Sequence, residues 1–118
     1  LLLAFVGLCV WASDGLAGNV PQSQIDGLKY IFDSAGGPNW IWDPNISGVA
    51  WNFTNITVNP CINEWQGVTC SANCSDFETC NITGLNVLGH NLRGSLPNEM
   101  SLLSTLQKLN VDFNYLTG

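Results

Sequence analysis

A single histidine, His90, limits the catalysis that this chain can perform. A nucleophile–His–acid triad would have to use its imidazole, and no recognisable catalytic motif surrounds it. The nine Asp and Glu residues are scattered, with no pair placed for acid–base work. The glycines fall at predicted turns and caps rather than in a phosphate-binding loop. We therefore expect no catalytic site, no enzyme activity and no cofactor.

Cysteine offers two further kinds of chemistry, metal binding and disulfide formation. The relevant residues are Cys61, Cys70, Cys74 and Cys80. A metal site would add His90 as a ligand, but no Cys-x-x-Cys pair is present, and zinc sites usually start from one. We expect disulfides and no metal. Four cysteines allow three pairings, and the short loops that they close favour Cys61–Cys70 with Cys74–Cys80.

The N-terminal stretch indicates that the protein is secreted. Cysteines of secreted proteins ordinarily form disulfides. Residues 1–12 form an apolar run that is too short to span a membrane and fits the core of a signal peptide. Cleavage is expected after Ala12 or Ala17, and either would remove Cys9. We assign residues 1–17 to a signal peptide whose charged start is missing. The alternative is a buried helix or strand of the fold.

Five Asn-x-Ser/Thr sequons support the secretory route independently. They begin at Asn45, Asn52, Asn55, Asn73 and Asn81. Asn52 and Asn55 compete for one glycan, and Asn73 precedes a cysteine that is expected to be bridged.

The net charge of −6 argues against nucleic acid or an anionic membrane as partner, because both require basic patches.

A helix is predicted before the cysteines. Ser23 is a candidate N-cap, with Asp26 completing a capping box, and Gly36-Gly37-Pro38 ends the helix. Its apolar stripe consists of Ile25, Leu28, Ile31, Phe32 and Ala35. Three tryptophans follow at positions 40, 42 and 51. They form either an end plug for the core or a platform on which sugars stack, and we favour the plug.

The C-terminal third contains an internal repeat whose period is about 24 residues, a length typical of solenoids. The matched pairs are Ile82 with Leu106, Leu85 with Leu109, Val87 with Val111, Leu92 with Leu116 and Gly94 with Gly118. Stacked units of a solenoid bury a shared core. The pattern Leu-x-Val places two apolar side chains on one face of a short strand. The open end, from Leu109 to Leu116, is expected to expose an apolar edge.

This repeat, with its run Leu-x-Val-x-x-His-x-Leu-x-Gly-x-Leu-Pro, resembles the plant-type leucine-rich repeat. Asn114 holds the family's buried Asn position in the second copy, and His90 holds it in the first. The segment Cys61-Ile-Asn-Glu-Trp65-Gln-Gly67-Val68-Thr-Cys70 resembles the Cys-x-Trp-x-Gly-Val-x-Cys cap that precedes such repeats, with two extra residues. The resemblance covers residues 23–118.

The resemblance implies an α/β fold: a fragment of a right-handed leucine-rich repeat solenoid with short parallel strands and a disulfide-bearing helical cap. The cap would occupy residues 18–81, the first repeat 82–105 and an incomplete second repeat 106–118. Outward positions on the strands are then candidates for ligand contact. They are Asn86, Leu88, Lys108, Asn110 and Asp112.

Three functions follow from the resemblance. The first is an extracellular recognition module, secreted or on the cell surface, that binds a protein, peptide or glycan in signalling. A membrane would be involved only through an anchor outside this fragment. The second is a secreted inhibitor of wall-degrading enzymes similar to polygalacturonase inhibitors. The third is a structural cell-wall protein.

Overall fold

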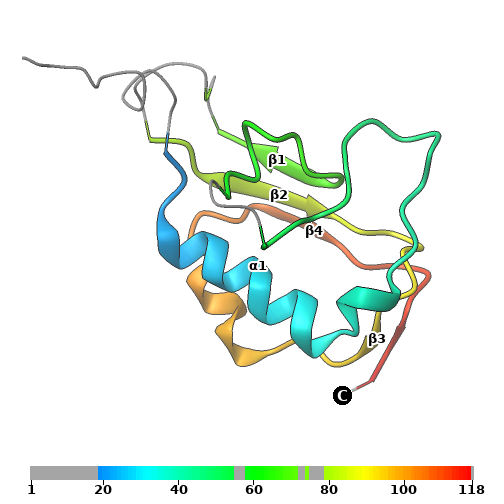
Figure 1. The fold of residues 1–118 in the computed structure, drawn as a ribbon. Helices are drawn as coiled ribbons and strands as arrows, with labels where there is room; N and C mark the ends of the chain where they lie inside the picture. The colour runs from blue at the N-terminus through cyan, green and yellow to red at the C-terminus, as the bar shows by residue number, and fades with distance from the viewer. Residues whose placement is uncertain (1–18, 55–57, 72–73, 75–78, 118) are drawn as a thin grey trace, which may run out of the picture.

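The computed structural model describes residues 19–54, 58–71, 74 and 79–117. The predicted signal peptide and the sequons at Asn55 and Asn73 lie outside the described residues. Figure 1 shows a helix running beneath a small sheet, with the C-terminal segments continuing along one side. No helix among the described residues is long and apolar enough to cross a membrane.

The described α-helix, α1 (Gln22–Ser34), contributes its predicted stripe to a core that also contains residues of the sheet. Ile25, Leu28 and Ile31 are buried, because residues three and four apart share one helix face. The helix ends where the glycines predict: Gly36 adopts the left-handed conformation, with φ 72°, which glycine enters without steric cost. A short 3-10 helix, η2 (Gly37–Asn39), follows.

The predicted cap at Ser23 is wrong, since the helix begins one residue earlier, at Gln22, and Pro21 precedes it. No side chain caps this end. The carbonyl of Pro21 instead accepts the Gln24 N–H at 3.0 Å, and proline has no N–H of its own to satisfy. Asp26 does not complete a capping box; its carboxylate accepts a hydrogen bond from the Gln22 side chain at 3.0 Å.

Two sheets carry the repeated segments. In the first, β1 (Val68–Cys70) pairs antiparallel with β2 (Ile82–Asn86), and β2 pairs parallel with β4 (Lys108–Asn110). In the second, β3 (Arg93–Gly94) pairs parallel with β5 (Tyr115–Leu116). Leu85 lies opposite Leu109 in the β2–β4 register, so each residue faces its counterpart in the other copy. The chain therefore pairs its two copies at the period of the sequence repeat.

The return segment between the copies lies against α1. It forms a 3-10 helix, η3 (Asn98–Leu102), next to α1 in Figure 1. Leu103, which follows it, is 4% exposed, and its side chain comes within 3.1 Å of where a Cβ on Gly27 would lie. Glycine at position 27 thus lets α1 and the return segment approach closely. This explains why α1 contains a residue that weakens helices.

Three tryptophans are buried in the core, and Trp42 is half-buried against two of them, Trp40 and Trp51. Trp40 and Trp51 are each 5% exposed and Trp65 is 3% exposed. The Trp51 ring stacks on Trp65 at 5.6 Å and meets Trp40 edge-on at 5.0 Å. Their indole N–H groups are satisfied: Trp40 donates to the Ala35 carbonyl and Trp51 to the Gln66 carbonyl, each at 2.8 Å. The rings of Trp40, Trp51 and Trp65 therefore plug the core, as predicted for Trp40 and Trp51.

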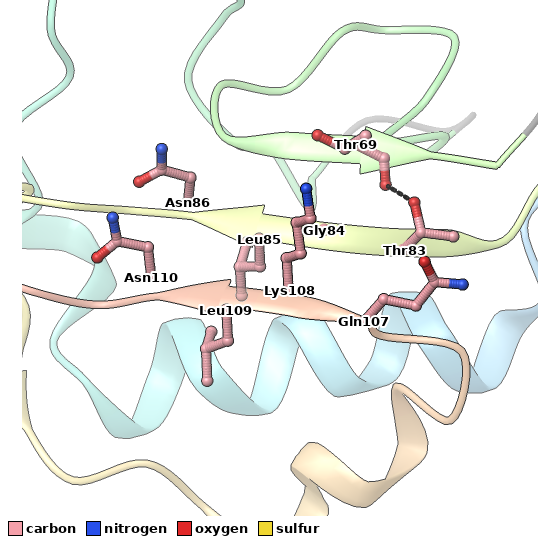
Figure 2. A pocket seen from close by; sticks show the side chains of 9 residues that line it. All are labelled: Thr69, Thr83, Gly84, Leu85, Asn86, Gln107, Lys108, Leu109 and Asn110. Carbon is pink, nitrogen blue, oxygen red and sulfur yellow. Dashed lines mark hydrogen bonds between the residues drawn. The ribbon is translucent and has the colours of Figure 1, made fainter.

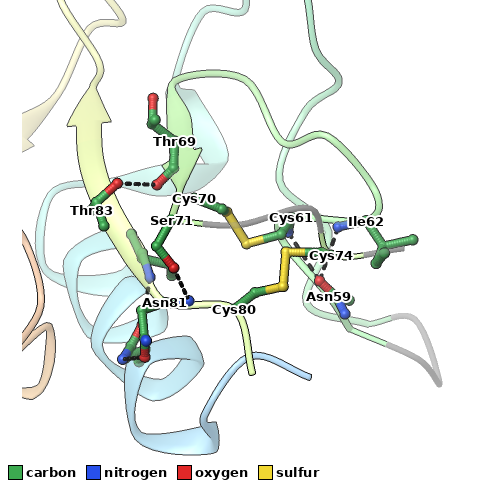
Figure 3. The surroundings of a disulfide bond; sticks show 12 residues. Asn59, Cys61, Ile62, Thr69, Cys70, Ser71, Cys74, Cys80, Asn81 and Thr83 are labelled. Carbon is green, nitrogen blue, oxygen red and sulfur yellow. Dashed lines mark hydrogen bonds between the residues drawn. A yellow bond between two sulfur atoms is a disulfide. The ribbon is translucent and has the colours of Figure 1, made fainter. Parts of the chain in front are cut away.

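The cysteines form two disulfides, Cys61–Cys70 and Cys74–Cys80 (Figure 3). The Cα atoms are 6.1 Å apart in the first pair and 5.7 Å apart in the second. Sulfur atoms of Cys61, Cys70 and Cys74 lie within 4.8 Å of one another. Each is already bonded to a partner sulfur, so none of the three offers a thiolate to a metal ion.

The second copy, from β4 to β5, exposes apolar side chains. Leu109 is 42% exposed, Tyr115 60% and Phe113 83%, whereas Leu85, the counterpart of Leu109 in the first copy, is 2% exposed. The exposed edge agrees with a stacking unit that needs a neighbour to bury its face. A leucine-rich repeat solenoid of further units stays a prediction.

Candidate ligand-binding surface

The outward face of β1, β2 and β4 forms a hollow of about 530 Å³, which we call the strand surface (Figure 2). Polar side chains from all three strands and from the residue before β4 surround it. The lining residues are Thr69, Thr83, Gly84, Leu85, Asn86, Gln107, Lys108, Leu109 and Asn110. None of them is acidic, although the chain as a whole carries a net charge of −6.

Asn86 and Asn110 form a ladder of two amides across the sheet. They lie opposite each other in the parallel register, and Figure 2 shows their side chains side by side. The Oδ1 atom of Asn86 accepts the Leu88 N–H at 3.2 Å, and that of Asn110 accepts the Asp112 N–H at 3.0 Å. These contacts fix the carbonyl end of each amide, so the NH₂ end is the group that the ladder offers to a ligand.

Lys108 lies beside a strand position without a side chain. It pairs with Gly84 in the β2–β4 register, and its side chain extends over β2 at that point (Figure 2). Thr69 of β1 approaches Gly84 from the other side, with its Cβ 3.1 Å from where a Cβ on Gly84 would lie. Glycine therefore provides the floor of the hollow, between a threonine and a lysine.

The structure brings together three of the five predicted ligand-facing residues: Asn86, Lys108 and Asn110 all line the hollow. Leu88 and Asp112 are exposed but lie outside its lining. Three further polar lining residues were not predicted from the sequence, namely Thr69, Thr83 and Gln107. A signal for two of them was present, since Thr83 and Gln107 are separated by one repeat period and the Thr83 carbonyl accepts the Gln107 N–H at 2.7 Å.

His90 is a structural residue in this arrangement. It is 2% exposed. Its Nδ1 lies 2.7 Å from the Leu88 carbonyl oxygen, and its Nε2 lies 2.8 Å from Oε1 of Gln66, itself 2% exposed. In the second copy, Asn114 donates to the carbonyl of Asp112, the counterpart of Leu88, at 3.2 Å. The histidine thus repeats one contact of the asparagine and adds another that reaches the cap.

The described sequons differ in their surroundings. Asn45 and Asn52 are exposed, and the hydroxyl of Thr54 donates to Oδ1 of Asn52 at 2.6 Å. Asn81 is half-buried, and its Oδ1 accepts from the buried Gln24 side chain at 3.0 Å. Asn45 and Asn52 therefore have the more open positions for a glycan.

No family model matches the chain. Two proteins of Arabidopsis thaliana are similar to it. One is a probable leucine-rich repeat receptor-like serine/threonine-protein kinase, 28% identical over 118 residues, a match that covers 96% of this chain and 11% of that protein. The other is described in nearly the same words and is 26% identical over 123 residues, covering 100% and 11%. The chain is thus similar to a region of plant leucine-rich repeat receptor-like kinases, and it spans about a tenth of their length.

Proposed function

We propose that this chain is the N-terminal cap and first repeats of an extracellular leucine-rich repeat recognition module. The module is secreted or held at the cell surface and binds a protein, peptide or glycan through the strand surface. One observation carries the proposal: two copies of the repeat pair in parallel with matched residues opposite each other, which aligns their outward polar residues into one face. The similarity to receptor-like kinases supports the same interpretation.

The proposal assigns binding rather than catalysis to this part of the chain. The hollow contains amides, hydroxyls and one lysine, with neither a histidine nor a carboxylate that would act as base or acid. His90 is buried, and both of its ring nitrogens have partners. The kinase activity named for the relatives is not proposed for these residues.

A glycan wedge tests which face binds the ligand. Replacing Asp112 with serine creates an Asn-x-Ser sequon that begins at Asn110, so that a secreted protein carries a bulky glycan on the strand surface. The full-length gene product is screened against immobilised peptides, extracellular proteins and cell-wall oligosaccharides. We expect Asp112→Ser to lose ligand binding and enzymatic removal of most of the glycan to restore it. Asp112→Ala, which creates no sequon, is the matched control.

Equal binding by the wedge variant and the parent would contradict the proposal. The same screen includes wall-degrading enzymes, so inhibition of one of them would favour the inhibitor alternative over a receptor. Reading the transcript beyond codon 118 tests the repeat architecture separately. We expect another apolar-x-apolar pair one repeat period after Leu109 and Val111, and no further repeat would contradict the solenoid.

A further inference from the structure

We propose that the hollow over Gly84 is a subsite for a uronic acid residue of an oligosaccharide, with Lys108 binding the carboxylate. This inference rests on the proposed function and names its ligand class. The first observation concerns the partners of the basic side chains. Of the three basic residues, Lys29 pairs with Asp33 at 2.8 Å, and the Arg93 guanidinium lies 4.3 Å over the Tyr115 ring. Lys108 lines the hollow and has no ion-pair partner among the described residues.

The second observation is that the surroundings of Lys108 mainly offer donors. Each Oδ1 atom of Asn86 and Asn110 already accepts one backbone N–H, and the two NH₂ groups add four N–H donors. The lysine ammonium adds three donors and no acceptor, and the Thr69 hydroxyl lies beside it in the lining. A carboxylate is an acceptor-only group with two oxygens, so it matches this set.

The third observation distinguishes a sugar acid from an acidic peptide. Polar groups surround the lysine on both sides along the strands, with Thr83 and Gln107 towards one end and the asparagine ladder towards the other (Figure 2). The carboxylate of a single Asp or Glu side chain would engage the lysine but supplies no hydroxyl for these neighbours. A uronic acid carries hydroxyls around the ring as well as its carboxylate, so one ligand satisfies the lysine and its neighbours together.

The experiment measures binding of the full-length gene product to three probes: a hexamer of galacturonic acid, its methyl ester and a hexapeptide of glutamate. We expect the acid hexamer to bind and the other two to bind at least tenfold more weakly. Lys108→Gln should weaken binding of the acid hexamer about tenfold, the loss of one charged hydrogen bond. Raising the salt concentration should narrow the difference between the variants, because salt screens exposed charges.

Lys29→Gln is the matched control, because it removes one positive charge from α1, where the lysine is already paired with Asp33. Equal weakening by both substitutions would overturn the subsite, since net charge alone would explain it. Preference for the methyl ester or the peptide, or full affinity in Lys108→Gln, would overturn it as well. If the methyl ester or the peptide is preferred and its binding is still lost with the glycan wedge at Asn110, the proposed function stands and only the uronate assignment is wrong. If no ligand binds to the strand surface, both the proposed function and the uronate subsite are wrong.

Discussion

Gln66 connects the cap to the first repeat through its side-chain amide, and its removal should destabilise the protein strongly. The residue is 2% exposed. Its Oε1 accepts the Asp43 N–H at 3.0 Å and lies 2.8 Å from Nε2 of His90. Its Nε2 donates to the carbonyls of Asp43 at 2.9 Å and Ile46 at 3.3 Å. Gln66→Ala removes every one of these contacts at once.

The stability lost in Gln66→Ala depends on which of these partners water can reach once the glutamine side chain is gone. His90 is buried, so its Nε2 would lose a partner without gaining water, at about 1–3 kcal/mol. The backbone groups of Asp43 and Ile46 are nearer the surface, and water replaces part of what they lose. The cavity left by the side chain adds to the cost. We expect Gln66→Ala to lower the free energy of unfolding by about 2–4 kcal/mol in total.

Urea unfolding followed by tryptophan fluorescence measures this loss, because four tryptophans lie in or near the cap core. Gln107→Ala is the control, since that glutamine is exposed on the strand surface, and it should change stability by less than about 0.5 kcal/mol. Hydrogen exchange gives a second readout: the Ile41 amide, which donates to the His90 carbonyl at 2.8 Å, should exchange faster in Gln66→Ala. Equal unfolding midpoints for the two alanine variants would refute the reasoning.

Two further predictions concern the covalent and backbone constraints of the cap. Replacing Cys61 and Cys70 together with Ser opens the loop closed by their disulfide and should cost about 2–4 kcal/mol; thermal melting unchanged from the parent would contradict this. Gly67→Ala should cost more than Gly89→Ala, measured by urea unfolding. Both glycines have positive φ, 84° and 65°, but a Cβ on Gly67 would collide with the Asn86 carbonyl oxygen, whereas nothing lies within 4 Å of one on Gly89. Equal costs would show that the close approach is unimportant.

The parts of the structure that the sequence predicts are those set by periodicity. A repeat with matched apolar positions can pair in parallel at its own period, and Leu85 lies opposite Leu109 for this reason. The apolar stripe of α1 and its glycine end are local patterns and are likewise predictable. The lining residues on the repeated strands inherit the same period, which is how Asn86, Lys108 and Asn110 could be named in advance.

The parts that it does not predict depend on contacts between distant segments. Thr69 reaches the strand surface because β1 pairs antiparallel with β2, and no period relates β1 to the repeats. Gln66 looks in the sequence like an ordinary polar residue, and only its position beside His90 gives it a structural role. The predicted helix start was wrong for a related reason. Serine favours the N-cap position, but the carbonyl of Pro21 already accepts hydrogen bonds from the first N–H groups of the helix.

These long-range contacts make the cap part of the strand surface rather than only a cover for the core. The Gly67 carbonyl accepts the Asn86 N–H at 2.8 Å, so the cap positions the backbone of the first amide in the ladder. The Gln66–His90 contact continues to the Leu88 carbonyl, and the Leu88 N–H orients the Asn86 side chain. A change in the cap can therefore reach Asn86 by two routes. Binding of a ligand to the ladder should depend on an intact cap even though neither Gly67 nor Gln66 lines the hollow.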